Sequence, residues 1–169
     1  YLVLDMYTAV DDSNLIAICK PIDKSSKPDL TVNNFEISRN FNFLKSISIV
    51  QISLIREFHN IRNSFSKILI WGAGGRGSAF INLIQNNNLI DDNVYITDSD
   101  KTKYNYYVTG TKRKIQSAKG LIDKVDCVII TTYLGEKDIL KEINELCPPN
   151  EFRPKIYVLD KKSLKERKI

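Results

Sequence analysis

ILIWGAGGRG, at residues 68–77, is the stretch that decides the fold of this chain. Its first four residues are apolar, and Gly72, Gly74 and Gly77 follow the spacing G-x-G-x-x-G. An amphipathic segment comes next, at residues 77–85. In a strand–loop–helix setting, the first glycine permits a tight turn and the second lets phosphates approach the backbone. The third lets the helix pack close to the strand, so the stretch predicts the start of a nucleotide-binding type of sheet.

Apolar runs alternate with amphipathic segments through residues 67–160. We expect strands at residues 67–71, 94–97, 126–132 and 155–159, and helices at residues 77–85 and 136–146. Pro148 and Pro149 end the last helix, because proline cannot continue it. The polar segment 101–120 predicts a short hairpin and a short helix from Ser117. The alternation predicts an α/β fold with a Rossmann-like, doubly wound, mainly parallel sheet that is covered on both faces.

The segments that flank this domain, residues 67–160, have other patterns. Residues 1–33 predict a β-hairpin followed by a polar linker, and a lone hairpin is marginal in water. Residues 34–66 carry a long amphipathic helix, whose apolar residues recur every three or four positions through residue 62. This helix either covers the sheet of its own domain or mediates a homo-oligomer. Residues 161–169 predict a solvated basic tail.

Composition excludes several classes of protein. The net charge is +5, and residues 161–169 alone hold five cations and one acid. A basic tail can contact nucleic acid, but little else in the sequence favours that partner. No apolar run is long enough for a membrane span. The cysteines, three in number, have no metal-ligand spacing, so we expect no disulfide framework and no metal site. A cytoplasmic protein is the expectation, and the start at Tyr1 suggests a piece of a longer polypeptide.

The loop residues Gly72, Ala73, Gly74, Gly75, Arg76 and Gly77 are the first candidates for ligand binding. The helix that follows presents unpaired N–H groups to an anion. Arg76 either pairs with a phosphate or is a solvated surface charge. The competing interpretation of the loop is a glycine turn that permits helix–strand packing and holds no ligand.

Two further groups lie where strands of the predicted sheet end. Asp98 follows the second strand, where dinucleotide folds use an acid to accept ribose hydroxyls, although Asp98-Ser99-Asp100 is also good turn chemistry. Thr131, Thr132 and Tyr133 follow the third strand, beyond which ligands bind in open α/β sheets. For these three, ordinary loop polarity is the alternative.

No catalytic residue can be assigned. His59 is the one histidine of the chain and lies in the long helix, far in sequence from the glycine loop. The sequence marks out neither a Ser/His/Asp set nor a pair of carboxylates. We therefore expect a domain that binds a ligand but is not catalytic alone.

These features together resemble the C-terminal domain of bacterial S-adenosylmethionine-dependent sugar C-methyltransferases. That family has a G-A-x-x-K/R-G loop, here Gly72 to Gly77, and then a strand that ends in Asp, here Asp98. It often continues with K-x-x-x-x-x-P-G, here Lys103 to Gly110 with Thr109 in place of Pro. A Ser-started short helix and a D-x-V-x-x strand follow, here from Ser117 and from Asp126. Thr109 and Arg76 depart from the commoner residues and leave the substrate open.

The resemblance implies a division of labour. Residues 1–20 look like the last two strands of a preceding methyltransferase domain, which would bind S-adenosylmethionine, so this fragment itself is assigned no cofactor. The C-terminal domain would hold a nucleotide-sugar at the glycine loop, in sugar or surface-polysaccharide biosynthesis. Two rivals stay open: an NAD(P)-binding domain of an oxidoreductase, and an assembly module with a vestigial nucleotide site.

Overall fold

The computed structural model describes residues 2–8, 15–20, 34–147 and 153–167. By its contacts the chain divides into two compact units, Tyr1–Phe43 and Leu44–Ile169. The division falls inside the long helix. The linker expected before it, residues 21–33, lies outside the described residues.

The first unit contains the predicted hairpin. β1 (Leu2–Thr8) pairs antiparallel with β2 (Leu15–Lys20), and the register places Thr8 opposite Leu15. The pairing is irregular between Val3 and Asp5, where the register shifts. The turn expected at residues 11–14 lies outside the described part of the chain. Helix α1 (Asn34–Ser64) begins in this unit and ends in the second.

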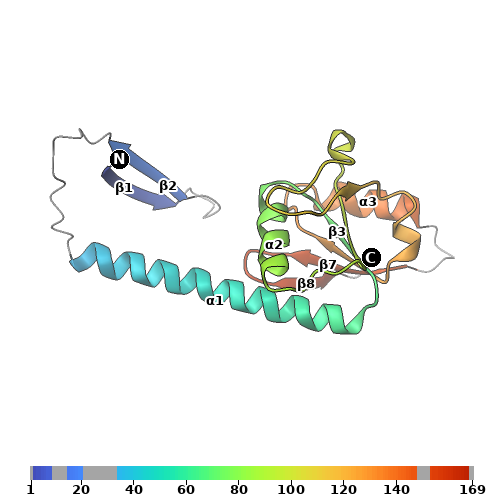
Figure 1. The fold of residues 1–169 in the computed structure, drawn as a ribbon, viewed down its shortest axis with the longest axis horizontal. Helices are drawn as coiled ribbons and strands as arrows, with labels where there is room; N and C mark the ends of the chain where they lie inside the picture. Colours follow the sequence, from blue (N-terminus) through green and yellow to red (C-terminus); the bar gives the residue numbers. More distant parts are fainter. Residues whose placement is uncertain (1, 9–14, 21–33, 148–152, 168–169) are drawn as a thin grey trace. The chain divides into compact units, whose positions relative to one another are not determined.

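The second unit is built on a sheet of six strands in the order β5-β4-β3-β6-β7-β8. Strands β3, β7 and β8 of this sheet are labelled in Figure 1. The strands are β3 (Ile68–Trp71), β4 (Val94–Thr97), β5 (Ile115–Gln116), β6 (Cys127–Ile130), β7 (Lys155–Leu159) and β8 (Leu164–Arg167). All neighbours are parallel except β7 and β8. This order is that of a Rossmann-like doubly wound sheet with one added antiparallel edge strand, which confirms the predicted fold class.

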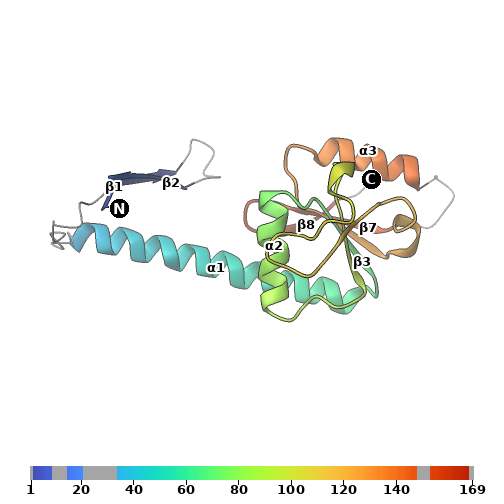
Figure 2. The same ribbon diagram turned by 45° about the horizontal axis from the view of Figure 1, so that its top comes forward.

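Helices cover both faces of this sheet. Helix α2 (Gly75–Asn86) and the second half of α1 pack on one face, through Phe58, Phe80 and Ile84. Helix α3 (Glu136–Leu146) and the 3₁₀ turn η2 (Ile122–Lys124) pack on the other. Figure 2 shows α2 and α3 on opposite sides of the strands. The central strands β3 and β6 are therefore buried along their whole length, as expected for parallel strands covered twice.

Two parts of the chain differ from expectation. Residues 164–167, predicted as part of a solvated tail, form β8, because Leu164 to Arg167 add to the open edge of β7. Between β4 and β6, a bridge between Tyr107 and Lys114 makes the predicted short hairpin. The helical turn there is η2, which begins at Ile122 rather than at Ser117.

The apolar stripe of α1 is buried only in part. Leu54, Phe58 and Ile61 are buried in the core of the second unit. Ile49 and Ile52, which widen the stripe in the sequence, are more than half exposed, at 59% and 56%. The helix thus covers its own sheet with one narrow face, and the prediction of a homo-oligomer through this helix stays untested.

Candidate functional site

The glycine loop lies where the strand order of the sheet reverses. From β3 the chain moves outward to β4 on one side, and later returns to β6 on the other side of β3. At such a reversal the loops after the two adjacent strands run in opposite directions, and open α/β sheets bind their ligands at this place. Residues 72–77 follow β3 and residues 131–133 follow β6, and the contact of Thr131 with Gly72 brings these two predicted groups together.

Two glycines of the loop are required by close packing. Gly72 has φ +111°, and a Cβ placed there would lie 2.6 Å from Thr131 Oγ1. A Cβ on Gly77 would lie 1.8 Å from the carbonyl oxygen of Gly72. No side chain fits at either position while the backbone stays in place. These two glycines therefore let α2 pack closely on the end of β3, as the sequence predicts.

The other two glycines border open space. A Cβ on Gly74 or on Gly75 would meet nothing within 4 Å. Gly74 is the N-cap of α2 and supplies no side-chain cap, and the first turn of the helix contains no acid. The first N–H groups of a helix have no intrahelical partner, so this helix start can receive an anion on its backbone. The same geometry would suit the oxygens of a phosphate.

Asp98 lies at the end of β4 and folds onto the glycine loop. Its Oδ2 accepts the backbone N–H of Ala73 at 2.7 Å, and its Oδ1 accepts the N–H of Asp100 at 2.9 Å. Lys103 Nζ lies 3.1 Å from Oδ2 and makes an ion pair with it. Asp98 is 8% exposed. The carboxylate therefore fixes the loop, and it also lies beside the place where a ligand would meet Gly74.

Arg76 points to the far side of the loop. Its guanidinium donates a hydrogen bond to the backbone carbonyl of Asp160, just after β7. The pKa of the Asp160 carboxyl is lowered by its hydrogen bond from Lys165 and by the backbone N–H of Lys161, with a further contribution from the charge of Arg76. A phosphate contact from Arg76 would need the side chain to leave this carbonyl, so that contact stays a prediction.

The hydroxyl residues after β6 have different environments. Thr131 is buried, and its hydroxyl lies 2.7 Å from the carbonyl oxygen of Gly72 and 3.1 Å from that of Trp71. The Thr131 hydroxyl therefore stabilises the glycine turn through these carbonyl oxygens. Thr132 Oγ1 accepts the N–H of Gly135 at 3.4 Å, while the Tyr133 side chain is 68% exposed. Of the three, Tyr133 is the most accessible to a ligand.

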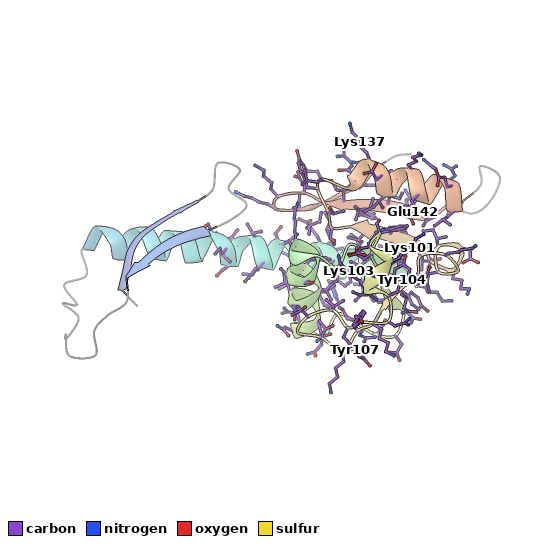
Figure 3. All side chains as sticks on the ribbon, turned by 90° about the horizontal axis from the view of Figure 1, so that it is seen from above. Lys101, Lys103, Tyr104, Tyr107, Lys137 and Glu142 are labelled. Atoms are coloured by element: carbon purple, nitrogen blue, oxygen red, sulfur yellow. The ribbon has the colours of Figure 1, made fainter. Side chains whose placement is uncertain are left out.

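Two features of the site were missed in the sequence. Trp71 Nε1 donates to Ser99 Oγ at 3.0 Å, and Ser99 Oγ lies 3.5 Å from Glu142 Oε2 of α3. These two contacts connect the ends of β3 and β4 to α3, on the face of the sheet opposite α2. Lys103, which pairs with Asp98, lies at the end of η1 (Lys101–Lys103) in the segment after β4 (Figure 3). Lys103 begins the segment that resembles the family motif K-x-x-x-x-x-P-G, but the sequence does not indicate that it reaches Asp98 or that Ser99 reaches Trp71. Both contacts depend on how the turn after β4 folds back.

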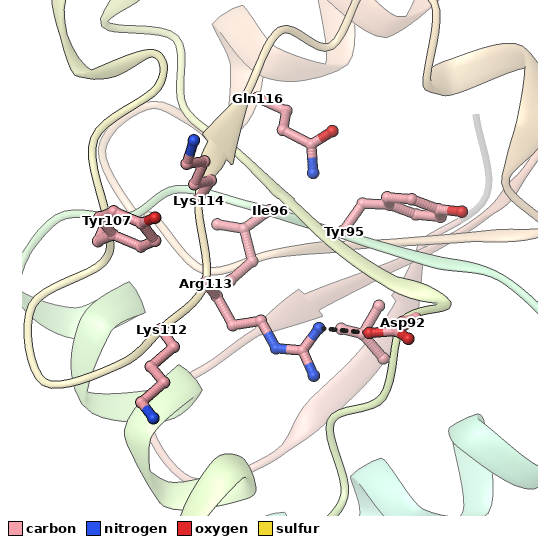
Figure 4. Close-up of a pocket in the computed structure, with 9 residues that line it drawn as sticks. Asp92, Tyr95, Ile96, Tyr107, Lys112, Arg113, Lys114 and Gln116 are labelled. Carbon is pink, nitrogen blue, oxygen red and sulfur yellow. Dashed lines mark hydrogen bonds and ion pairs between the residues drawn. The ribbon is translucent and has the colours of Figure 1, made fainter.

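A second concavity, of about 340 Å³, lies elsewhere (Figure 4). It runs along β4 and the segment that enters β5, and it is lined by Asp92, Val94, Tyr95, Ile96, Tyr107, Lys112, Arg113, Lys114 and Gln116. Arg113 there pairs with Asp92 at 3.4 Å and donates to the carbonyl oxygen of Ile90 at 3.2 Å. Of its cations, Arg113 is thus paired, and none of residues 72–77 and 131–133 lines this concavity.

Neither metal ligands nor a membrane-spanning helix occur in the described part of the chain. There, no three His, Cys, Asp or Glu side chains gather in a way that could hold a metal ion. No described helix has both the length and the apolar character needed to cross a bilayer.

Comparison with known proteins adds little. No protein-family model matches the chain, and no curated protein does. The crystal structure of UDP-D-quinovosamine 4-dehydrogenase from Vibrio fischeri is similar over 61% of this chain and 93% of that chain, with 20% identity and a TM-score of 0.43. So slight a likeness assigns no function to this chain. The resemblance to sugar C-methyltransferases finds no support among these matches.

Proposed function

We propose that the unit Leu44–Ile169 binds the diphosphate group of a nucleotide ligand at the glycine loop. The observation that carries this proposal is the bare start of α2, where Gly74 and Gly75 border open space and no side chain caps the helix. A diphosphate supplies acceptor oxygens and negative charge, which match the free N–H groups and the positive end of the helix dipole. The place of this helix start at the reversal of the strand order supports the same proposal.

Of the ligands with a diphosphate, NAD(P) has the stronger support. The strand order and the complete G-x-G-x-x-G loop are those of dinucleotide-binding sheets. A nucleotide-linked sugar is the second candidate, since its diphosphate would use the same N–H groups. This order reverses the preference drawn from the family resemblance, because the resemblance gains no support from the comparisons.

The proposed role is binding rather than complete catalysis. His59 lies on the exposed side of α1, whereas the loops after β4 and β6 carry the carboxylate of Asp98 and the hydroxyls of Thr132 and Tyr133. A reaction would then need groups from the substrate, from another domain or from another chain. A preceding methyltransferase domain that binds S-adenosylmethionine, a place in sugar biosynthesis and a cytoplasmic location remain parts of this proposal. The sequence of the parent gene would test the first of them.

A thermal-shift panel tests the proposal. The full chain is melted alone and with NAD, NADP, UDP- and dTDP-linked sugars and S-adenosylmethionine, each in turn. A ligand present at about a hundred times its Kd stabilises the folded state by about 2.7 kcal/mol, which raises the Tm by roughly 5–10 °C. We expect such a shift with a ligand that contains a diphosphate. Absence of a shift with every ligand would contradict the proposal and leave the loop as a packing device.

Gly74→Val supplies the matched variant. A Cβ added at Gly74 meets nothing within 4 Å, so a valine there extends into the space that phosphates would occupy. Gly74→Val should abolish the ligand-induced rise in Tm. The rise is measured against the Tm of the variant alone, because valine at the N-cap itself costs about 1 kcal/mol of stability. Ala79→Val, which enlarges an exposed position of the same helix, should keep the shift. If Gly74→Val keeps it as well, the ligand binds elsewhere.

A further inference from the structure

At the end of β4, the charged side chain still available to a ligand is the ammonium of Lys103 rather than the carboxylate of Asp98. Asp98 is the acid that this position of a dinucleotide fold would offer to ribose hydroxyls. A carboxylate has two oxygens with about four acceptor sites. Three are occupied, by the N–H of Ala73, the N–H of Asp100 and the ammonium of Lys103. With 8% of Asp98 exposed, little capacity remains for the pair of hydroxyls that a ribose presents.

Lys103 is better placed for a new partner. Its side chain is 37% exposed, and Asp98 is its ion-pair partner among the described residues. An ammonium carries three donors, so two remain beyond the one that Asp98 receives. Asp100 caps the turn that carries Lys103, because its Oδ1 accepts the N–H of Thr102 at 3.0 Å and the hydroxyl of Thr102 at 2.6 Å. The Lys103 ammonium is therefore carried at the edge of the site by a turn that these hydrogen bonds stabilise.

We infer that Lys103 makes the site selective for a ligand with a phosphate on the ribose. This inference rests on the proposed function. A free carboxylate at the end of the second strand would repel a ribose phosphate, whereas the charge of Asp98 is offset by Lys103 and its oxygens accept two backbone N–H groups. The ammonium then pairs with the 2′-phosphate that distinguishes NADP from NAD. The ligand class is accordingly the phosphorylated dinucleotide, NADP.

Neighbouring charges favour the same outcome. Lys101 lies two residues before Lys103, in the same short turn (Figure 3), and is exposed. The start of α2 adds the partial positive charge of its dipole beside Ala73. The acid that opposes them, Asp100, has its pKa lowered by hydrogen bonds from the Thr102 side chain and backbone. It stays ionised but remains engaged with the turn.

Calorimetric titration of the full chain tests the inference. NADP, NAD and UDP-glucose are titrated into the wild type, Lys103→Gln and Lys141→Gln. Lys141 is a matched control, because it also makes an ion pair, with Glu145 at 3.9 Å, but on the exposed side of α3. We expect the wild type to bind NADP at least about tenfold more tightly than NAD, because NAD lacks the phosphate that would accept a charged hydrogen bond from Lys103. Lys103→Gln should remove that preference by weakening NADP alone, and Lys141→Gln should keep it.

Four results would overturn the inference, and they can be told apart. Equal or tighter binding of NAD by the wild type would show that Lys103 does not select the phosphate. An equal loss for both ligands in Lys103→Gln would show that Lys103 only shapes the loop through Asp98. If the wild type binds UDP-glucose but neither dinucleotide, the inference fails while the proposed diphosphate site stands. If it binds none of the three, the proposed function fails too. Circular dichroism melts of each variant verify that it is folded.

Discussion

The carbonyl oxygen of Gly72 lies 1.8 Å from the position that a Cβ on Gly77 would take. The two glycines are therefore a packing pair, in which the end of β3 touches the first turn of α2. Gly74 and Gly75, between them, have no such neighbour. One loop thus contains glycines that the fold needs and glycines that a ligand would need.

Gly77→Ala should destabilise the second unit. The added methyl group clashes with backbone rather than with a flexible side chain, so α2 must shift from β3, at a cost of at least about 2 kcal/mol. Gly75→Ala is the control, since its Cβ enters open space and alanine favours a helix. Urea unfolding of both variants measures the difference. Equal stability of the two variants would contradict the packing described for this loop.

Thr131→Val should also lower stability, through hydrogen bonding rather than through volume. Valine has nearly the shape of threonine but would leave the carbonyl oxygen of Gly72 without the hydroxyl that lies 2.7 Å away. A buried group that loses its partner costs about 1–3 kcal/mol. Thr132→Val, at a half-buried position with a contact of 3.4 Å, should cost less. An unchanged free energy of unfolding in Thr131→Val would show that the hydroxyl does not support the turn.

Substitutions along α1 should separate its two faces. Phe58 is fully buried, and its ring packs edge-to-face on Phe80 with 5.8 Å between the ring centroids. Phe58→Ala should therefore lower the free energy of unfolding by about 3–5 kcal/mol. Ile52→Glu changes a side chain that is 56% exposed and should cost little. Sedimentation of Ile52→Glu beside the wild type also tests the predicted homo-oligomer. A dimeric wild type and a monomeric variant would support it, and a monomeric wild type would contradict it.

The pattern of the sequence was sufficient for the regular elements of the second unit. β4, β7 and α3 begin and end where the sequence predicts, because apolar runs and helical periodicity report burial directly. β8 was missed because its residues are mostly charged and exposed, as is usual for an edge strand. Its pairing with β7 depends on tertiary contact, which no local pattern records.

The site was predictable in position but less so in detail. The glycine spacing located the loop, and the strand ends located Asp98 and Thr131. Their roles follow from three-dimensional contacts: Asp98 accepts the N–H of Ala73, and Thr131 lies beneath Gly72. Arg76, adjacent to the glycines, turns to the carbonyl of Asp160 instead of the open space. Sequence gives the neighbourhood of a side chain, whereas its partner depends on the direction of each turn.

The buried thiols should be unreactive in the folded protein. Cys127 and Cys147 are buried, and burial raises the pKa of the Cys127 thiol well above its ordinary value, with the carboxylates of Asp126 and Glu166 adding to the effect. The thiolate that reacts with disulfide reagents is therefore scarce between about pH 7 and pH 9. In a Cys19→Ser background, labelling should stay slow over that range and become fast in denaturant. Fast labelling without denaturant would show that this core opens readily.

The most direct test of the diphosphate site follows individual backbone amides. Amide-resolved NMR spectra of the full chain are recorded while NADP, NAD or UDP-glucose is added. If a diphosphate lies on the start of α2, the amide signals of Gly74, Gly75 and Arg76 move first and furthest, because their N–H groups gain charged acceptors. Shifts confined to Lys112–Gln116, in the second concavity, or no shift with any of the three ligands, would contradict the account.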